Sequence, residues 1–167
     1  MKKIIFPIVA LALATIGFQG CKPEPKGELG TPFDLVEGMN GTWYVSKFSQ
    51  VDLNNPLQEE RDLSQFFAVP NIEERMKITF NTSDRTFFVT PGAGKNYLLN
   101  SGTWGFDDDS APGELFLYGA EDTLKVTMSR MIRSFDNTLG IDLLPRSCNT
   151  GGSVINTVIY KYEFTRQ

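Results

Sequence analysis

From Asn40 onward, apolar and polar residues alternate in short runs separated by turn residues. In the run over 76–81, Ile78 and Phe80 fall on one face, and Lys77 and Thr79 fall on the other. This period of two is typical of a β-strand with one buried face. The pattern predicts nine strands, over Gly41–Val51, Met76–Asn81, Arg85–Thr90, Lys95–Leu99, Ser101–Phe106, Glu114–Tyr118, Thr123–Arg133, Thr138–Leu144 and Val154–Thr165.

One segment of the folded part, between Asp52 and Arg75, lacks this alternation. Within it, Asp62–Phe67 is predicted to form a short capped helical turn. No long crossover helix separates the strands, so the chain is predicted to be all-β and antiparallel. A sandwich and an up-and-down barrel of eight or nine strands both satisfy this pattern.

The first residues have the pattern of an export signal. Lys2 and Lys3 precede an apolar stretch over Ile4–Phe18, which is shorter than the ~20 residues that a membrane-spanning helix needs. Residues 1–20 are therefore predicted to be a signal peptide. The last residues before the cut, Phe18-Gln19-Gly20-Cys21, resemble the lipobox of bacterial lipoproteins, which implies that Cys21 is lipidated and becomes the first residue of the mature protein.

A tether rich in proline and glycine follows the lipobox. We expect residues 21–37 to form the lipidated cysteine and this flexible tether, and residues 38–167 to form the barrel domain. If Cys21 carries lipid, Cys148 has no partner and the fold has no intrachain disulfide.

Several short motifs together resemble a known family. Gly41-Thr42-Trp43 is similar to the Gly-x-Trp start of lipocalin-like barrels. The other pieces are similar, in order and spacing, to lipocalin-like lipoproteins of unknown function from Gram-negative gut anaerobes. They are Asp62–Phe66, Ile78–Asn81, Ser101–Asp107 and Ile159–Phe164. The resemblance implies a lipocalin-like up-and-down barrel and a cell-envelope location, and it implies no active site.

Composition narrows the chemistry. The chain of 167 residues has no His, which excludes Ser/His/Asp triads, Cys/His dyads and every metal site that contains His. A net charge of −4 argues against a nucleic-acid partner. We expect neither an enzyme nor a cofactor.

The loop after the fifth predicted strand is the most acidic part of the chain. Asp107, Asp109 and Glu114 could offer oxygen ligands to Ca²⁺, but their spacing is not that of an EF-hand, and a solvated turn is the expectation. Asp109-Ser110-Ala111 resembles a bacterial O-glycosylation sequon, which makes Ser110 a candidate modification site.

Aromatic residues are abundant, and most should fill the core. Trp43 is predicted to plug the closed end of the barrel, where the first strand pairs with the last. Trp104 is expected nearer an open rim. Of the adjacent pair Phe87 and Phe88, one ring should be exposed or covered by the helical turn. The candidate ligand contacts at the barrel mouth are Trp104, Phe106, Tyr118 and Phe88.

Two hypotheses of function remain. In the first, the protein is a lipid-anchored binding protein of the cell envelope that holds a small apolar or sugar-type ligand at the barrel mouth. In the second, it is a protein–protein interaction module, such as an accessory subunit or an inhibitor, with no small-molecule ligand. Under both, we expect a monomer attached to the outer membrane by its N-terminal lipid, facing the periplasm or the cell surface.

Overall fold

The computed structural model describes residues 33–130, 132, 137–145, 147–148 and 154–166. Its helical elements are short: the α-helix α2 (Leu35–Gly38) and the 3₁₀ turns η1 (Ser64–Phe66) and η2 (Ile72–Glu74). The strands are β1 (Gly41–Asp52), β2 (Glu60–Asp62), β3 (Lys77–Asn81), β4 (Thr86–Thr90), β5 (Ser101–Phe106), β6 (Glu114–Tyr118), β7 (Thr123–Arg130), β8 (Thr138–Leu143), β9 (Ser147–Cys148), β10 (Val154–Ile155) and β11 (Val158–Arg166).

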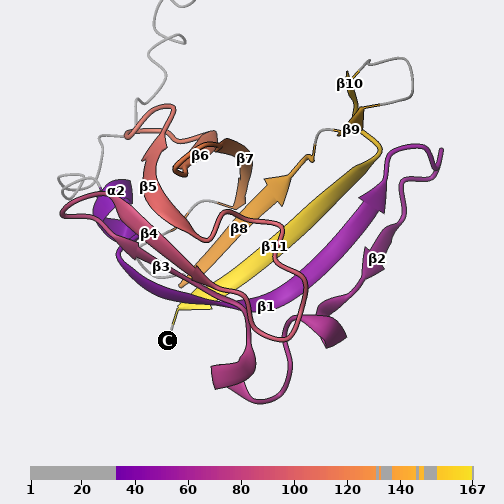
Figure 1. The fold of residues 1–167 in the computed structure, drawn as a ribbon, viewed down its shortest axis with the longest axis horizontal. Helices are drawn as coiled ribbons and strands as arrows, with labels where there is room; N and C mark the ends of the chain where they lie inside the picture. The colour runs from indigo at the N-terminus through magenta and orange to yellow at the C-terminus, as the bar shows by residue number, and fades with distance from the viewer. Residues whose placement is uncertain (1–32, 131, 133–136, 146, 149–153, 167) are drawn as a thin grey trace, which may run out of the picture. The chain divides into compact units, whose positions relative to one another are not determined.

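Eight of the described strands close into an antiparallel up-and-down barrel, in the order β1-β3-β4-β5-β6-β7-β8-β11, with β11 pairing back onto β1 (Figure 1). The ninth strand of this sheet, β2, adds to β1 alone, and β9 and β10 form a separate small hairpin. The prediction of an all-β antiparallel barrel is confirmed, and the sandwich is excluded because the sheet closes on itself.

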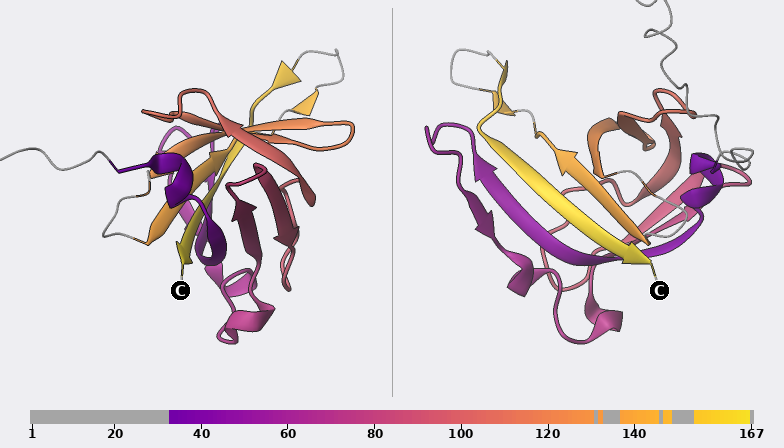
Figure 2. Two further views of the ribbon diagram at one scale, coloured as in Figure 1. Left: turned by 90° about the vertical axis from the view of Figure 1, so that its left-hand side faces the viewer. Right: turned by 180° about the vertical axis from the view of Figure 1, so that it is seen from behind.

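Strand β1 is the longest strand and organises the barrel. Its first residues pair with β3 and its later residues pair with β2, while β11 runs along its other side (Figure 2). The register with β11 shifts between Val45 and Lys47, and the hydroxyl of Ser46 donates to the carbonyl of Glu163 at 3.0 Å. A bulge of this kind bends a strand, which lets β1 pass from one neighbour to another.

Side chains fill the barrel interior. Alternate residues of the strands point inward, as the period of two predicts, and their rings and branched side chains are almost wholly buried. The largest of them are Trp43, Tyr162, Phe48, Phe80, Phe164, Met76, Ile78, Leu115, Leu117, Leu139 and Ile141. The interior is therefore a packed core over the described residues.

The barrel end where β1 begins is covered by α2. The side chain of Asp34 caps this helix by accepting from the backbone N–H of Glu37 at 3.0 Å. Trp43 is fully buried below it, and its indole N–H donates to the carbonyl of Met39 at 2.8 Å. The guanidinium of Arg166, opposite Trp43 on β11, lies 5.0 Å from the indole ring. The predicted plug at the junction of first and last strands is confirmed.

The opposite end of the barrel is packed with aromatic rings. Phe48 lies 3.8 Å from Phe67 and 5.7 Å from Tyr160 between ring centroids. Tyr97, from the segment between β4 and β5, stacks on Tyr160 at 4.2 Å. These four rings close the end where we expected a mouth.

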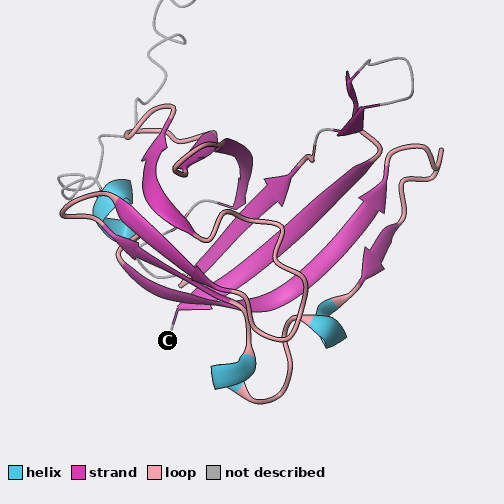
Figure 3. Ribbon diagram, viewed as in Figure 1, coloured by secondary structure: helices cyan, strands magenta, loops and turns pink. Residues whose placement is uncertain are grey.

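The observed elements and the placement of one residue differ from the sequence prediction (Figure 3). Lys95–Leu99 is not a strand, and the predicted helical turn is the shorter η1. The predicted last strand is divided between β10 and β11, and both α2 and β2 were missed. Trp104 lies near the end of β5, at the same barrel end as Trp43, so its placement at an open rim is wrong.

Candidate functional site

The four aromatic residues predicted to contact a ligand do not form one site. Trp104 and Phe106 point inward and meet at 5.4 Å, and the indole N–H of Trp104, which is only 2% exposed, donates to the carbonyl of Asn81. Phe88 and Tyr118 point outward and are 58% and 43% exposed. Because alternate residues face opposite sides of a strand, the two pairs are separated by the barrel wall.

The acidic loop is held by separate local contacts. One carboxylate oxygen of Asp107 accepts from the backbone N–H groups of Gly113 and Glu114, at 3.0 and 2.9 Å. Asp109 forms a two-pronged ion pair with Arg85, at 3.1 and 2.8 Å. These contacts lower the pKa of both aspartates, mainly through the Glu114 N–H for Asp107 and the Arg85 guanidinium for Asp109. Asp107, Asp109 and Glu114 therefore have different partners, and Glu114 pairs with Lys125.

Of the two candidate modification sites, Ser110 lies within the described residues and Cys21 does not. Ser110 is exposed in the loop between β5 and β6, where its backbone N–H donates to Asp108 at 2.8 Å. This exposure would allow a glycan, and modification stays a prediction. The lipidation candidate Cys21 lies outside the described residues.

A large recess in the described chain lies on the outside of the barrel, between β6–β7 and the end of β8. It has a volume of about 760 Å³, within the range of ligand sites. Residues of β6 and β7 form one wall, and residues at and after the end of β8 form another; Figure 1 shows the curled β6–β7 hairpin to which the first wall belongs. We call it the β7–β8 groove; it is lined by Glu114, Phe116, Thr123, Leu124, Lys125, Thr127, Asp142, Leu144, Pro145 and Asn156.

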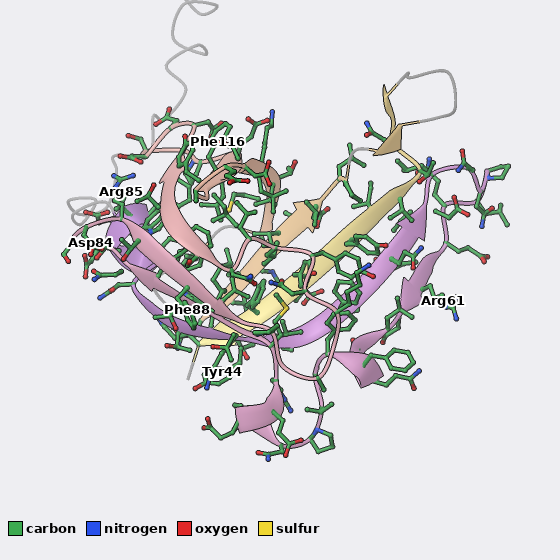
Figure 4. The ribbon with its side chains drawn as sticks, viewed as in Figure 1. Tyr44, Arg61, Asp84, Arg85, Phe88 and Phe116 are labelled. Atoms are coloured by element: carbon green, nitrogen blue, oxygen red, sulfur yellow. The ribbon has the colours of Figure 1, made fainter. Side chains whose placement is uncertain are left out.

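The groove combines apolar and polar walls. Phe116 lines it and stacks on Tyr118, with ring centroids 6.1 Å apart, and Leu144, which also lines it, is 40% exposed. Figure 4 shows Phe116 on the curled hairpin, well away from Phe88. None of the four aromatic residues predicted to contact a ligand lines this groove, although Tyr118 stacks on Phe116, which does; Glu114, a predicted oxygen ligand for Ca²⁺, also lines it.

The groove exists because β7 and β8 pair over only part of their length. All five residues of β6 pair with β7, whereas β8 pairs only with Thr127, Met128 and Arg130 of β7. Thr123 and Lys125 consequently have no strand partner on the β8 side among the described residues. Alternating hydrophobicity does not report where two neighbouring strands diverge, so sequence reasoning missed this site.

Asp142 lies where β7 and β8 begin to separate. In the sheet register it stands opposite Thr127 on β7 and opposite Lys161 on β11. Its Oδ1 atom is buried and has no hydrogen-bond partner within the described residues. A buried acceptor without a donor carries a desolvation cost that an incoming N–H or O–H group would remove.

An ion-pair network covers the outer face next to the groove. Glu60 of β2 binds Lys47 at 2.7 Å and Lys161 at 3.4 Å, and Glu163 lies 4.0 Å from Arg130. The hydrogen bond from Lys47, followed by one from Ser49, lowers the pKa of Glu60 to about 2. The network surrounds a smaller recess of about 240 Å³, and its charges are already paired with one another.

Comparison with known proteins adds no family. No protein-family model matches the chain, and no curated protein matches its sequence significantly. Among the residues that the structure describes, no helix has the length and apolar character to cross a bilayer.

Proposed function

We propose that the protein is a lipid-anchored binding module of the cell envelope that recognises a protein partner on the outer wall of its barrel. The observation that carries this proposal is the position of the β7–β8 groove. Side chains fill the barrel, and the β7–β8 groove lies outside it. A packed interior favours an interaction module over a carrier that holds its ligand inside.

The anchor is the second part of the proposal. The signal-like segment over residues 1–20 and the lipobox-like Phe18–Cys21 support export and lipidation. A resemblance to lipocalin-like lipoproteins supports the same location. We place the domain at the outer membrane, on the periplasmic side or at the cell surface, as a monomer.

Site-specific photocrosslinking in the cells that produce the protein tests the partner. A photoreactive amino acid replaces Leu144 in the groove or, as a matched control, Leu57, which is 75% exposed in the loop between β1 and β2. We expect one defined polypeptide adduct from position 144 and none from position 57. The same adducts at both positions, or none at 144, would contradict the proposal.

A small sugar-type ligand is the second candidate, and one observation favours it. The stacked rings of Phe116 and Tyr118, inclined by 13°, lie on the outer wall beside the carboxylate of Glu114 and the hydroxyl groups of the groove. Titration calorimetry with a panel of neutral oligosaccharides tests this candidate. Heat that disappears in Phe116→Ala and persists in Phe88→Ala would support it.

A further inference from the structure

The unpaired part of β7 offers backbone hydrogen-bonding groups to the groove. In an antiparallel pair, successive residues direct their N–H and C=O groups to alternate sides of the strand. The N–H of Met128 donates to the carbonyl of Gly113 at 2.8 Å, so Met128 faces the β6 side. Counting back along β7, Val126 and Leu124 also face β6, whereas Thr123, Lys125 and Thr127 face β8.

Of those three residues, only Thr127 has a strand partner, which is Asp142. The N–H and C=O groups of Thr123 and Lys125 therefore point into the β7–β8 groove with no strand opposite them in the described chain. From Thr123 to Lys125 this unpaired edge extends for about 7 Å, at about 3.3 Å per residue.

Strand β2 provides an informative contrast, because it also has a free edge. Its three residues, Glu60, Arg61 and Asp62, are all charged and exposed, which is the composition that discourages pairing with another chain. The β7 edge lies instead inside a recess whose walls include Phe116, Leu144 and Pro145. An edge of this kind is suited to accept a strand.

We propose that the β7–β8 groove binds an extended peptide segment of the partner protein by strand addition to β7. The segment would exchange backbone hydrogen bonds with Thr123 and Lys125, as in other complexes formed by strand addition. Its alternate side chains would contact Phe116 and Leu144. A basic side chain or other donor at one end would meet the carboxylate of Asp142 where it lines the groove. This inference rests on the proposed function and specifies how the partner is recognised.

The first test uses peptides as probes. A phage-displayed random heptapeptide library is selected on the immobilised, full mature chain in detergent, and the selected peptides are synthesised. We expect peptides with alternating apolar residues and a Lys or Arg near one end. N-methylation at alternate peptide bonds should weaken binding about three- to tenfold per bond, and methylation at the intervening bonds should not, because only alternate N–H groups face β7.

The second test changes the protein. Lys125→Pro removes the N–H group that faces the groove without removing a bond to β6, and Lys125→Ala is the matched control that loses the ion pair with Glu114 but keeps the N–H group. We expect about three- to tenfold weaker peptide binding in Lys125→Pro than in Lys125→Ala. Asp142→Asn should reduce the preference for a basic residue.

Three outcomes would overturn strand addition. They are peptides whose binding is insensitive to N-methylation, equal binding by the two Lys125 variants, and a selection that yields no groove-dependent peptide. The N-methylation result comes from the probe alone, so it holds even if Lys125→Pro folds poorly. A crosslink at position 144 together with any of these outcomes would leave the proposed function standing and remove only this mode of recognition.

Discussion

At the scale of single residues, the two tryptophans have similar environments, although they lie far apart in the sequence. Trp43 and Trp104 are 0% and 2% exposed, and both lie at the barrel end that α2 covers. We expect Trp43→Ala and Trp104→Ala each to lower the free energy of unfolding by about 3–5 kcal/mol, through lost burial and a residual cavity. Urea unfolding measures this cost, with the exposed Phe88→Ala as a control that should change stability by less than about 1 kcal/mol. A mild effect in Trp104→Ala alone would contradict the structure.

Tyr162 shows how a buried polar group can be unnecessary for folding. Its ring is fully buried, and its hydroxyl has no well-formed hydrogen bond in the described chain, although the backbone of Tyr97 lies beside it. Burial raises the pKa of this phenol. We expect Tyr162→Phe to remain within about 1 kcal/mol of the wild type or to exceed it, because the substitution removes an unsatisfied group and keeps the ring. Thermal unfolding measures this effect: the melting temperature of Tyr162→Phe should stay close to that of the wild type, whereas that of Tyr162→Ala should fall by several °C.

At the scale of strands, the close approach of β5 and β6 requires glycine at one position and not at another. A Cβ atom on Gly102 would overlap the carbonyl oxygen of Tyr118, whereas a Cβ on Gly105 would have its nearest neighbour at 3.9 Å. We expect Gly102→Ala to cost about 1–3 kcal/mol or more through overpacking. Gly105→Ala, on the same strand, should be neutral or slightly stabilising. Equal melting temperatures for the two variants would contradict this reading of the β5–β6 contact.

The attachment of β2 to the barrel should depend on pH. The folded state lowers the pKa of Glu60 from 4.5 to about 2, so its contacts with Lys47 and Lys161 stabilise the fold fully above pH 4.5. This contribution is lost as the pH falls from 4.5 towards 2, where the carboxylate takes up a proton. We expect wild-type stability to fall more steeply than that of Glu60→Gln across this range. Urea midpoints at pH 5 and pH 3 measure the difference, and Glu59→Gln, at an exposed neighbouring position, is the control.

One short segment, Lys95–Leu99, caused the main error in the strand prediction. Lys95–Leu99 was predicted to be a strand, but it is a loop that carries Tyr97 into the aromatic cluster. In an up-and-down barrel each strand reverses direction, so one extra strand moves every later residue to the opposite end. This explains why Trp104 was assigned to the wrong end, although the bounds of β5 were predicted correctly.

The candidate site was harder to predict than the fold. Inward-facing residues of β6 and β7, such as Leu115 and Val126, follow the alternating pattern and were placed in strands from it. The β7–β8 groove depends instead on how far two strands stay paired, and on a buried Asp142 oxygen without a donor. Hydrophobic periodicity encodes neither property, because it reports which face of a strand is buried and not which groups lie opposite it.

At the scale of the whole molecule, the proposed lipid anchor at Cys21 would determine where the barrel acts. Replacing Cys21 with Ala removes the thiol that the lipobox resemblance assigns to lipidation. We expect the Cys21→Ala protein to leave the membrane fraction or to retain its signal peptide, because several acyl chains together provide stable membrane attachment. Detergent-phase partitioning and the mass of the mature protein measure this result. Unchanged partitioning would refute the lipoprotein assignment.

The pairing of β1 with β11 has a consequence for how the protein folds. The seam joins residues near position 43 to residues near position 166, so two strands that are far apart in the sequence complete the wall. Contacts so distant in sequence form slowly, because a long stretch of chain must be ordered before they are made. Because β11 pairs with β1 on one side and with β8 on the other, the barrel wall closes only when β11 has joined both strands, so closure is a late step in folding.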